Sequence, residues 1–255
     1  MKNITLAIVV LALVMGSASL AVADPDPAVG NPDLKSMTAA QLEKDADSFR
    51  AQKNYILASE YLRAAIKKDR SNSILYNKLG ISEMQRGELR GAKTEFQNAL
   101  KKNSKFAEAM NNVGVIDLMQ KKFGSATKNF KKAIALQETN ATFHVNLGAA
   151  WLGQNKLERA ASEYTRAIEL DPEVLARSSR NGISAQLSTP EEKAKVDFLL
   201  ARIFASRGDV DRCLQCLQKA KEGGYGKLAD VYKDEQFARL WQDQRLAQIV
   251  PPPAK

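Results

Sequence analysis

Residues 107–136 read AEAMNNVGVIDLMQKKFGSATKNFKKAIAL, and this stretch decides the fold. In residues 107–120 and again in residues 123–136, apolar side chains recur three and four positions apart, which is the spacing of one face of an α-helix. A short polar turn at Lys121 and Lys122 separates the two patterns. The stretch therefore predicts two helices that fold back on each other as a hairpin.

The same pattern recurs at an interval of 34 residues. Four sets of residues repeat at this interval: Gly80, Gly114 and Gly148; Ala92, Ala126 and Ala160; Phe96, Phe130 and Tyr164; Ala99, Ala133 and Ala167. A fixed period of this length is the signature of a repeat protein, in which neighbouring hairpins bury a shared core. We expect the repeated glycines to let the first helix of a hairpin approach the second, because glycine carries no Cβ atom.

These residues resemble the tetratricopeptide repeat family, whose pattern is a small residue after Leu in the first helix, then Ala, an aromatic and Ala in the second. Units at 73–106, 107–140 and 141–174 match well, and the last closes with Asp171 and Pro172. A unit at 39–72 matches in part, with Leu62 at the aromatic position. The resemblance implies an all-α, right-handed superhelical solenoid with four repeats over residues 39–174.

A fifth hairpin is predicted over residues 190–225, after a serine-rich insertion at 175–189. Thr189 and Pro190 are typical of a helix start, and the sequence RGD at 207–209 is the expected turn. A register in phase with the earlier repeats also exists through Gly182, Ala194, Phe198 and Ala201. We prefer the register in which RGD is the turn.

The C-terminal segment is predicted to cover the last hairpin, since an end repeat otherwise leaves its core face in water. Capping helices are expected over 226–250, followed by a tail at 251–255. Their apolar residues are Leu228, Val231, Phe237, Leu240, Trp241 and Leu246.

The N-terminus has the pattern of a secretory signal peptide over residues 1–23, with cleavage after Ala23. A flexible leader is expected at 24–38. This predicts a periplasmic or secreted protein with no stable membrane span after cleavage. The alternative is an uncleaved N-terminus that anchors the protein in a membrane.

Catalytic and metal chemistry find little support in the sequence. His144 is the single histidine and is interpreted as a packed side chain, because no catalytic triad can be assembled around it. Cys213 and Cys216 are interpreted as small buried thiols, with a strained redox pair as the alternative, since a structural zinc needs four ligands. We therefore expect no enzyme activity, no metal and no cofactor. Aromatic residues do not alternate with the lysines, so no nucleic-acid partner is expected.

The resemblance implies that the first helices line a concave groove for an unidentified protein or peptide partner. It maps that face onto Asn77, Ile81, Met84, Asn111, Val115, Leu118, Val145, Ala149 and Leu152. The amides of this stripe are suited to hydrogen bonds with a peptide backbone, and Gly153 is expected to deepen the groove. Alternatively, Met84, Leu118 and Leu152 pack only against neighbouring helices.

These observations predict a non-catalytic protein–protein interaction scaffold in the cell envelope. The formal net charge of +9 supports an alternative, in which an envelope component binds an acidic polymer through surface lysines. Lys67, Lys68, Lys101 and Lys102 follow the last apolar residues of predicted helices, where they complement the helix dipole. Lys131 and Lys132 fall in mid-helix, where a solvated outer face is the simplest interpretation.

Overall fold

The computed structural model describes residues 33–174 and 190–253, and every regular element in those residues is a helix. The predicted signal peptide, most of the leader and the insertion at 175–189 lie outside the described residues. The chain divides into two units, residues 1–36 and 37–255, and all of the helices belong to the second. None of the described helices is long and apolar enough to cross a membrane.

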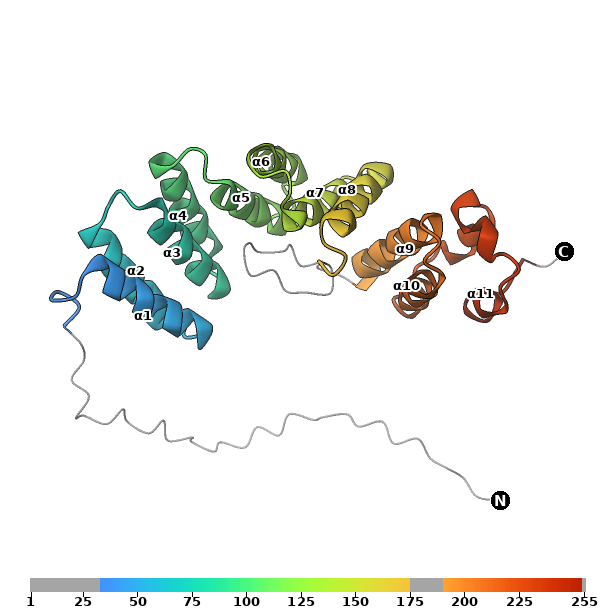
Figure 1. Cartoon of the computed structure of the whole chain (residues 1–255), viewed down its shortest axis with the longest axis horizontal. Helices are drawn as coiled ribbons and strands as arrows, with labels where there is room; N and C mark the ends of the chain where they lie inside the picture. The colour runs from blue at the N-terminus through green and yellow to red at the C-terminus, as the bar shows by residue number, and fades with distance from the viewer. Residues whose placement is uncertain (1–32, 175–189, 254–255) are drawn as a thin grey trace, which may run out of the picture. The chain divides into compact units, whose positions relative to one another are not determined.

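Five helical hairpins follow one another along the chain (Figure 1). They are α1 (Ala39–Ala51) with α2 (Tyr55–Lys68), α3 (Ser73–Gln85) with α4 (Leu89–Lys102), α5 (Ala107–Met119) with α6 (Phe123–Leu136), α7 (Ala141–Gly153) with α8 (Leu157–Leu170), and α9 (Pro190–Ser206) with α10 (Val210–Glu222). Within each hairpin the two helices pack more extensively on each other than on any other element. The predicted all-α solenoid of hairpins is confirmed.

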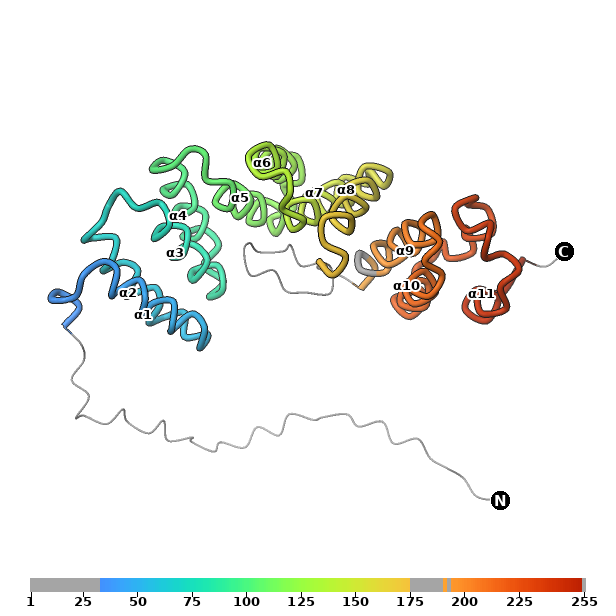
Figure 2. The backbone as a smooth tube through the Cα atoms, in the orientation of Figure 1, coloured from blue at the N-terminus to red at the C-terminus, as the bar shows by residue number. Residues whose placement is uncertain are grey.

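The hairpins turn through residues with a positive φ, a conformation that is uncommon outside glycine and asparagine. These residues are Lys53, Gly87, Lys121, Asn155 and Gly208, of which the first four are 34 residues apart. Figure 2 shows the backbone passing through these short turns from helix to helix. Gly208 lies between α9 and α10, so residues 207–209 form the turn of the fifth hairpin.

The repeated glycines are required by the aromatic residue of the same hairpin. A Cβ atom at Gly114 would lie 2.6 Å from the Phe130 ring, and one at Gly80 would lie 2.7 Å from the Phe96 ring. At Gly148 the corresponding distance to Tyr164 is 2.9 Å. All three separations are shorter than real carbon contacts, so the predicted close approach of the two helices is confirmed.

Beyond α10 the chain forms two 3₁₀ helices, η1 (Leu228–Tyr232) and η2 (Glu235–Leu240), and the short helix α11 (Gln244–Ile249). Val231, Phe237 and Leu246 are fully buried, and the Phe237 ring lies 5.8 Å from the Phe198 ring of α9. Trp241 is partly exposed, but its indole N–H donates to the Val231 carbonyl at 2.8 Å. The segment thus covers the core face of the last hairpin.

An arginine links the fourth hairpin, the fifth hairpin and this C-terminal segment. Arg202 of α9 lies 2.7 Å from a carboxylate oxygen of Glu158 in α8. Its Nε atom lies 2.8 Å from Asp234, the N-cap of η2. The described residues on either side of the insertion are therefore joined by an ion-pair network.

Candidate interaction surface

The nine residues predicted to line the groove all lie on α3, α5 and α7, the first helices of the second, third and fourth hairpins. Ile81, Leu118 and Val145 are half-buried and pack against the main core. The other six are buried: Asn77, Met84, Asn111, Val115, Ala149 and Leu152. These residues offer little exposed surface, and their contact with a partner stays a prediction.

The buried asparagines form a hydrogen-bonded ladder across the three first helices. The Asn112 amide donates to Asn77 Oδ1 at 3.0 Å, which joins α5 to α3. The Asn146 amide donates to Asn111 Oδ1 at 2.9 Å, which joins α7 to α5. A longer contact of 3.4 Å from Asn111 to Asn112 connects the two rungs. We call these four residues the amide ladder.

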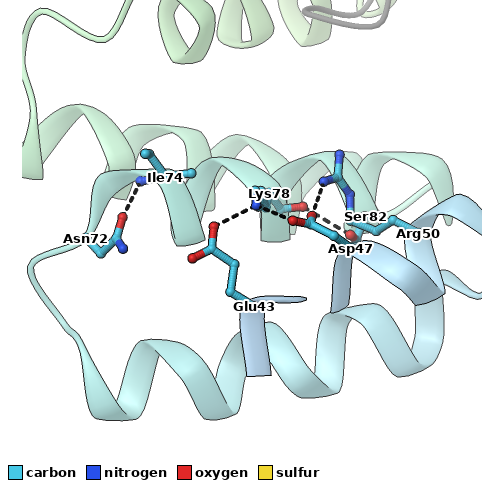
Figure 3. A network of polar contacts seen from close by, with 7 residues as sticks. All are labelled: Glu43, Asp47, Arg50, Asn72, Ile74, Lys78 and Ser82. Carbon is cyan, nitrogen blue, oxygen red and sulfur yellow. Dashed lines mark hydrogen bonds and ion pairs between the residues drawn. The ribbon is translucent and has the colours of Figure 1, made fainter. Parts of the chain in front are cut away.

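A salt-bridge rung extends the same register to the first hairpin. Figure 3 shows Lys78 of α3 reaching the carboxylates of Glu43 and Asp47 on α1, at 2.6 Å and 2.5 Å. Asp47 also accepts from Arg50 on its own helix at 2.9 Å. Lys78 therefore satisfies acids inside the protein, and its ammonium group is already paired.

All three rungs join a residue to the one 35 positions later, which is one residue more than the repeat. The donors Lys78, Asn112 and Asn146 were not among the predicted site residues. A signal for them exists, because they form a polar column that directly follows the predicted Asn77 and Asn111. The predicted stripe thus lies beside a set of bonds that fix neighbouring first helices in register.

Two buried acids form a second set of contacts between hairpins. Glu83 of α3 pairs with Arg63 of α2 at 2.7 Å, and burial raises the pKa of Glu83 although Arg63 opposes the shift. Asp117 of α5 pairs with Lys93 of α4 and accepts from Asn129 of α6 at 3.0 Å. The two ion pairs connect α2 to α3 and α4 to α5, and so link a second helix to the hairpin that follows it.

Trp151 of α7 occupies the same repeat position as those two acids, 34 residues after Asp117. It is buried, and three cations approach its ring. The Lys131 and Lys156 ammonium groups lie 5.1 Å and 4.9 Å from the ring centre, and the Arg159 guanidinium lies at 4.9 Å. Here a cation–π cluster replaces the ion pair.

His144 is a buried structural side chain of α7. Its Nδ1 lies 2.8 Å from a Glu163 carboxylate oxygen, and its Nε2 lies 3.0 Å from the Glu138 carbonyl oxygen. Burial lowers the pKa of His144, but the hydrogen bonds to Glu163 and Glu138 raise it by more, so the net shift is upward. Both ring nitrogens face acceptors, an arrangement that favours the charged imidazolium.

Cys213 and Cys216 are buried free thiols on α10. Burial raises the pKa of Cys213 to about 12 and the pKa of Cys216 to about 11. Over residues 33–174 and 190–253, no three His, Cys, Asp or Glu side chains gather as metal ligands.

Gly153 is exposed at the end of α7, and the expectation that it deepens the groove stays a prediction. A Cβ atom there would lie 2.3 Å from the ring of Phe123, which begins α6 in the preceding hairpin. Any side chain at Gly153 would therefore have to displace the Phe123 ring, which gives this glycine a packing role between hairpins. Of the first-helix residues outside the predicted stripe, Ile74 and Met119 are the large apolar side chains exposed to solvent.

Comparisons with known proteins identify the repeats. Two family models described as tetratricopeptide repeat match the chain, one over residues 77–127 and one over residues 141–174. No curated protein matches the sequence.

Several solved structures share the fold. Pseudomonas aeruginosa pilF is 18% identical, with a TM-score of 0.55 over 84% of this chain and 93% of that chain. MamA from Desulfovibrio magneticus RS-1, from residue 41 to its end, is 19% identical, with a TM-score of 0.53 over 72% of this chain and 93% of that chain. YrrB, described as a TPR protein with an unusual peptide-binding site, is 17% identical, with a TM-score of 0.50 over 76% of this chain and 91% of that chain. The repeat period, the stacked hairpins and the two family matches show that this chain is a tetratricopeptide repeat protein.

Proposed function

We propose that this protein is a non-catalytic scaffold that binds a segment of a partner protein along α3, α5 and α7. The observation that carries the proposal is the amide ladder, which ties these three helices together in register. A binding face whose elements are already fixed loses less conformational entropy when a partner docks. The amide ladder thus fixes the three helices of the binding face in place, while other side chains contact the partner.

The contacts would come from apolar side chains beside the ladder. Ile81, Leu118 and Val145 are half-buried, one on each helix, and all pack on the core. Their positions are therefore held rigidly while part of each side chain stays accessible. A peptide-binding site in YrrB, which shares the fold, is in keeping with this use of the repeats.

Pull-down from envelope extract with substituted scaffolds tests this proposal. Leu118→Asp places a charge in the apolar contact, and a captured partner should bind at least tenfold more weakly. Ile56→Asp is the matched control, since Ile56 is 66% exposed on α2, and its binding should not change. Circular dichroism checks the fold, and Val145→Asp is the second variant if Leu118→Asp unfolds. Equal binding by folded Leu118→Asp, Val145→Asp and Ile56→Asp would reject the proposal.

The proposed location is the cell envelope or the exterior, with residues 1–23 removed on export. The support is the apolar N-terminal run that ends Ala21, Val22, Ala23. Mass spectrometry of the protein from fractionated cells should find a mature chain that starts near Asp24. An intact N-terminus in the membrane fraction would favour the anchored alternative.

A further inference from the structure

The helix α6 and the turn before it carry positive charge with no negative charge. Residues 118–137 contain five lysines and no Asp or Glu, whereas α2, α4, α8 and α10 each contain at least one acid. The five are Lys121, Lys122, Lys128, Lys131 and Lys132, and all are exposed. None of them forms an ion pair within the described part of the chain.

The next hairpin adds two more cations to this surface. Lys156 precedes α8 and Arg159 lies in its first turn, and both converge with Lys131 on the Trp151 ring. We call the seven cations the basic surface: Lys121, Lys122, Lys128, Lys131, Lys132, Lys156 and Arg159. Lys156 and Arg159 are exposed and, like the lysines of α6, have no carboxylate partner among residues 33–174 and 190–253.

The cations around Trp151 repel one another. Each lies within about 5 Å of the same ring centre, so no two of them are more than about 10 Å apart, which is about one Debye length at 0.1 M salt. Elsewhere in this protein a cation between hairpins faces a carboxylate, as Arg63 faces Glu83. At Trp151 that acid is missing, and a negative charge brought by a partner would remove the repulsion.

Exposed apolar side chains lie at both ends of the basic surface. Met119 is 50% exposed just before the Lys121 turn, and Leu136 is 40% exposed at the end of α6. Leu136 follows Lys132 by four residues, so the two share a face of the helix. A polymer that carries only negative groups would leave these two side chains uncovered, whereas a protein segment can cover them.

We propose that the basic surface binds an acidic segment of another protein that carries leucine-like side chains between its carboxylates. The helix α6 has 14 residues and is about 20 Å long, so an extended segment of about six residues would span it. The seven cations lie on α6, on the hairpin turns and in the first turn of α8, and none of them belongs to the proposed binding face on α3, α5 and α7. The two proposals are therefore tested by substitutions at different residues, and each can fail without the other.

The test uses a fluorescein-labelled peptide of alternating glutamate and leucine residues and the mature protein. Lys128→Gln with Lys131→Gln and Lys132→Gln should weaken binding at least tenfold. The matched control, Lys101→Gln with Lys102→Gln and Lys105→Gln, removes the same charge from exposed lysines near the end of α4 and should change binding less than twofold. Binding should also weaken as salt rises.

A local signal comes from Trp151. With Trp241→Phe, Trp151 is the only tryptophan left, and its emission should shift when peptide draws Lys131 away from the ring. Equal loss in both lysine triples, or no peptide binding by the wild type, would overturn the proposal. Polyphosphate that binds at α6 more tightly than the peptide, with no loss when the peptide leucines become serine, would assign the surface to an acidic polymer instead.

Discussion

Single residues in this protein are constrained mainly by how closely helices approach. The repeat glycines face aromatic rings of their own hairpin, and Gly153 faces Phe123 of the preceding one. By contrast, Gly124 lies in α6 with open space where a Cβ would stand. All of these glycines lie within helices, where glycine is a poor helix former, and they differ in the packing around them.

Substituting alanine at two of these glycines should have opposite effects. Gly114→Ala should destabilise the protein by about 1–3 kcal/mol, because the new methyl group overlaps Phe130. Gly124→Ala should stabilise it by up to about 1 kcal/mol through helix propensity. Urea denaturation measures both. Equal effects of the two substitutions would contradict the packing account.

The stability contributed by His144 should depend on pH. The folded pKa of His144 lies above its ordinary value of 6.5, so the folded state binds the proton more tightly than the unfolded state. The contribution is fully present below the unfolded pKa and is lost as pH rises through the raised folded pKa. The difference in unfolding free energy between wild type and His144→Gln should therefore shrink as pH rises above the ordinary pKa of 6.5. A difference that stays constant would be evidence against this role.

Both cysteines should resist modification in the folded protein. Burial holds the pKa of Cys213 near 12 and that of Cys216 near 11, so the reactive thiolate is scarce at neutral pH. Iodoacetamide at about pH 8 should label them only after urea unfolds the chain. Fast labelling of the native protein, or a native disulfide between the two, would show the redox pair instead.

At the scale of elements, the hairpins are joined by polar rungs as well as by the apolar core. The rungs from Glu43 to Lys78, Asn77 to Asn112 and Asn111 to Asn146 all connect consecutive first helices. In the fourth hairpin the residue equivalent to Asn77 and Asn111 is Val145, which has no amide group to accept a further hydrogen bond. The ladder therefore spans the helices that we propose as the binding face.

Asn111→Ala should cost about 1–3 kcal/mol of unfolding free energy, because it leaves the buried Asn146 amide without its acceptor on α5. Asn98→Ala is the control, since Asn98 is half-buried on α4 and bonds to Glu95 of its own helix. It should change stability by less than about 0.5 kcal/mol. Chemical denaturation of both variants decides the matter, and an equally small effect would show that the ladder adds nothing.

For the whole molecule, the fold follows from the sequence because its period is local and repeated. Glycine, alanine and aromatic residues at a fixed interval specify both the helices of a hairpin and their contact. The surface is harder to predict. A repeat period shows which residues occupy equivalent positions, but it does not show which positions of neighbouring hairpins contact each other. Asn77 and Asn111 lie on the first helices as expected. Their amide oxygens, however, accept from Asn112 and Asn146, which stand one position later in the following repeat.

Gly153 shows a second limit of prediction from sequence. It approaches Phe123 of the preceding hairpin, yet the equivalent residues of the two earlier repeats, Gln85 and Met119, are not glycines, so the repeat pattern does not mark this position. The 3₁₀ helices of the C-terminal segment lie outside the repeat as well, so only their apolar residues indicated that they would cover a core.

The central claim is that a partner docks on the first helices of the solenoid. Hydroxyl-radical footprinting of the mature protein, with and without a partner captured from envelope extract, tests this directly because it measures the exposure of individual side chains. We expect slower oxidation of Ile81 and Leu118 in the complex and an unchanged rate at Ile56. Unchanged rates at Ile81 and Leu118 in a complex that is fully formed would contradict the account.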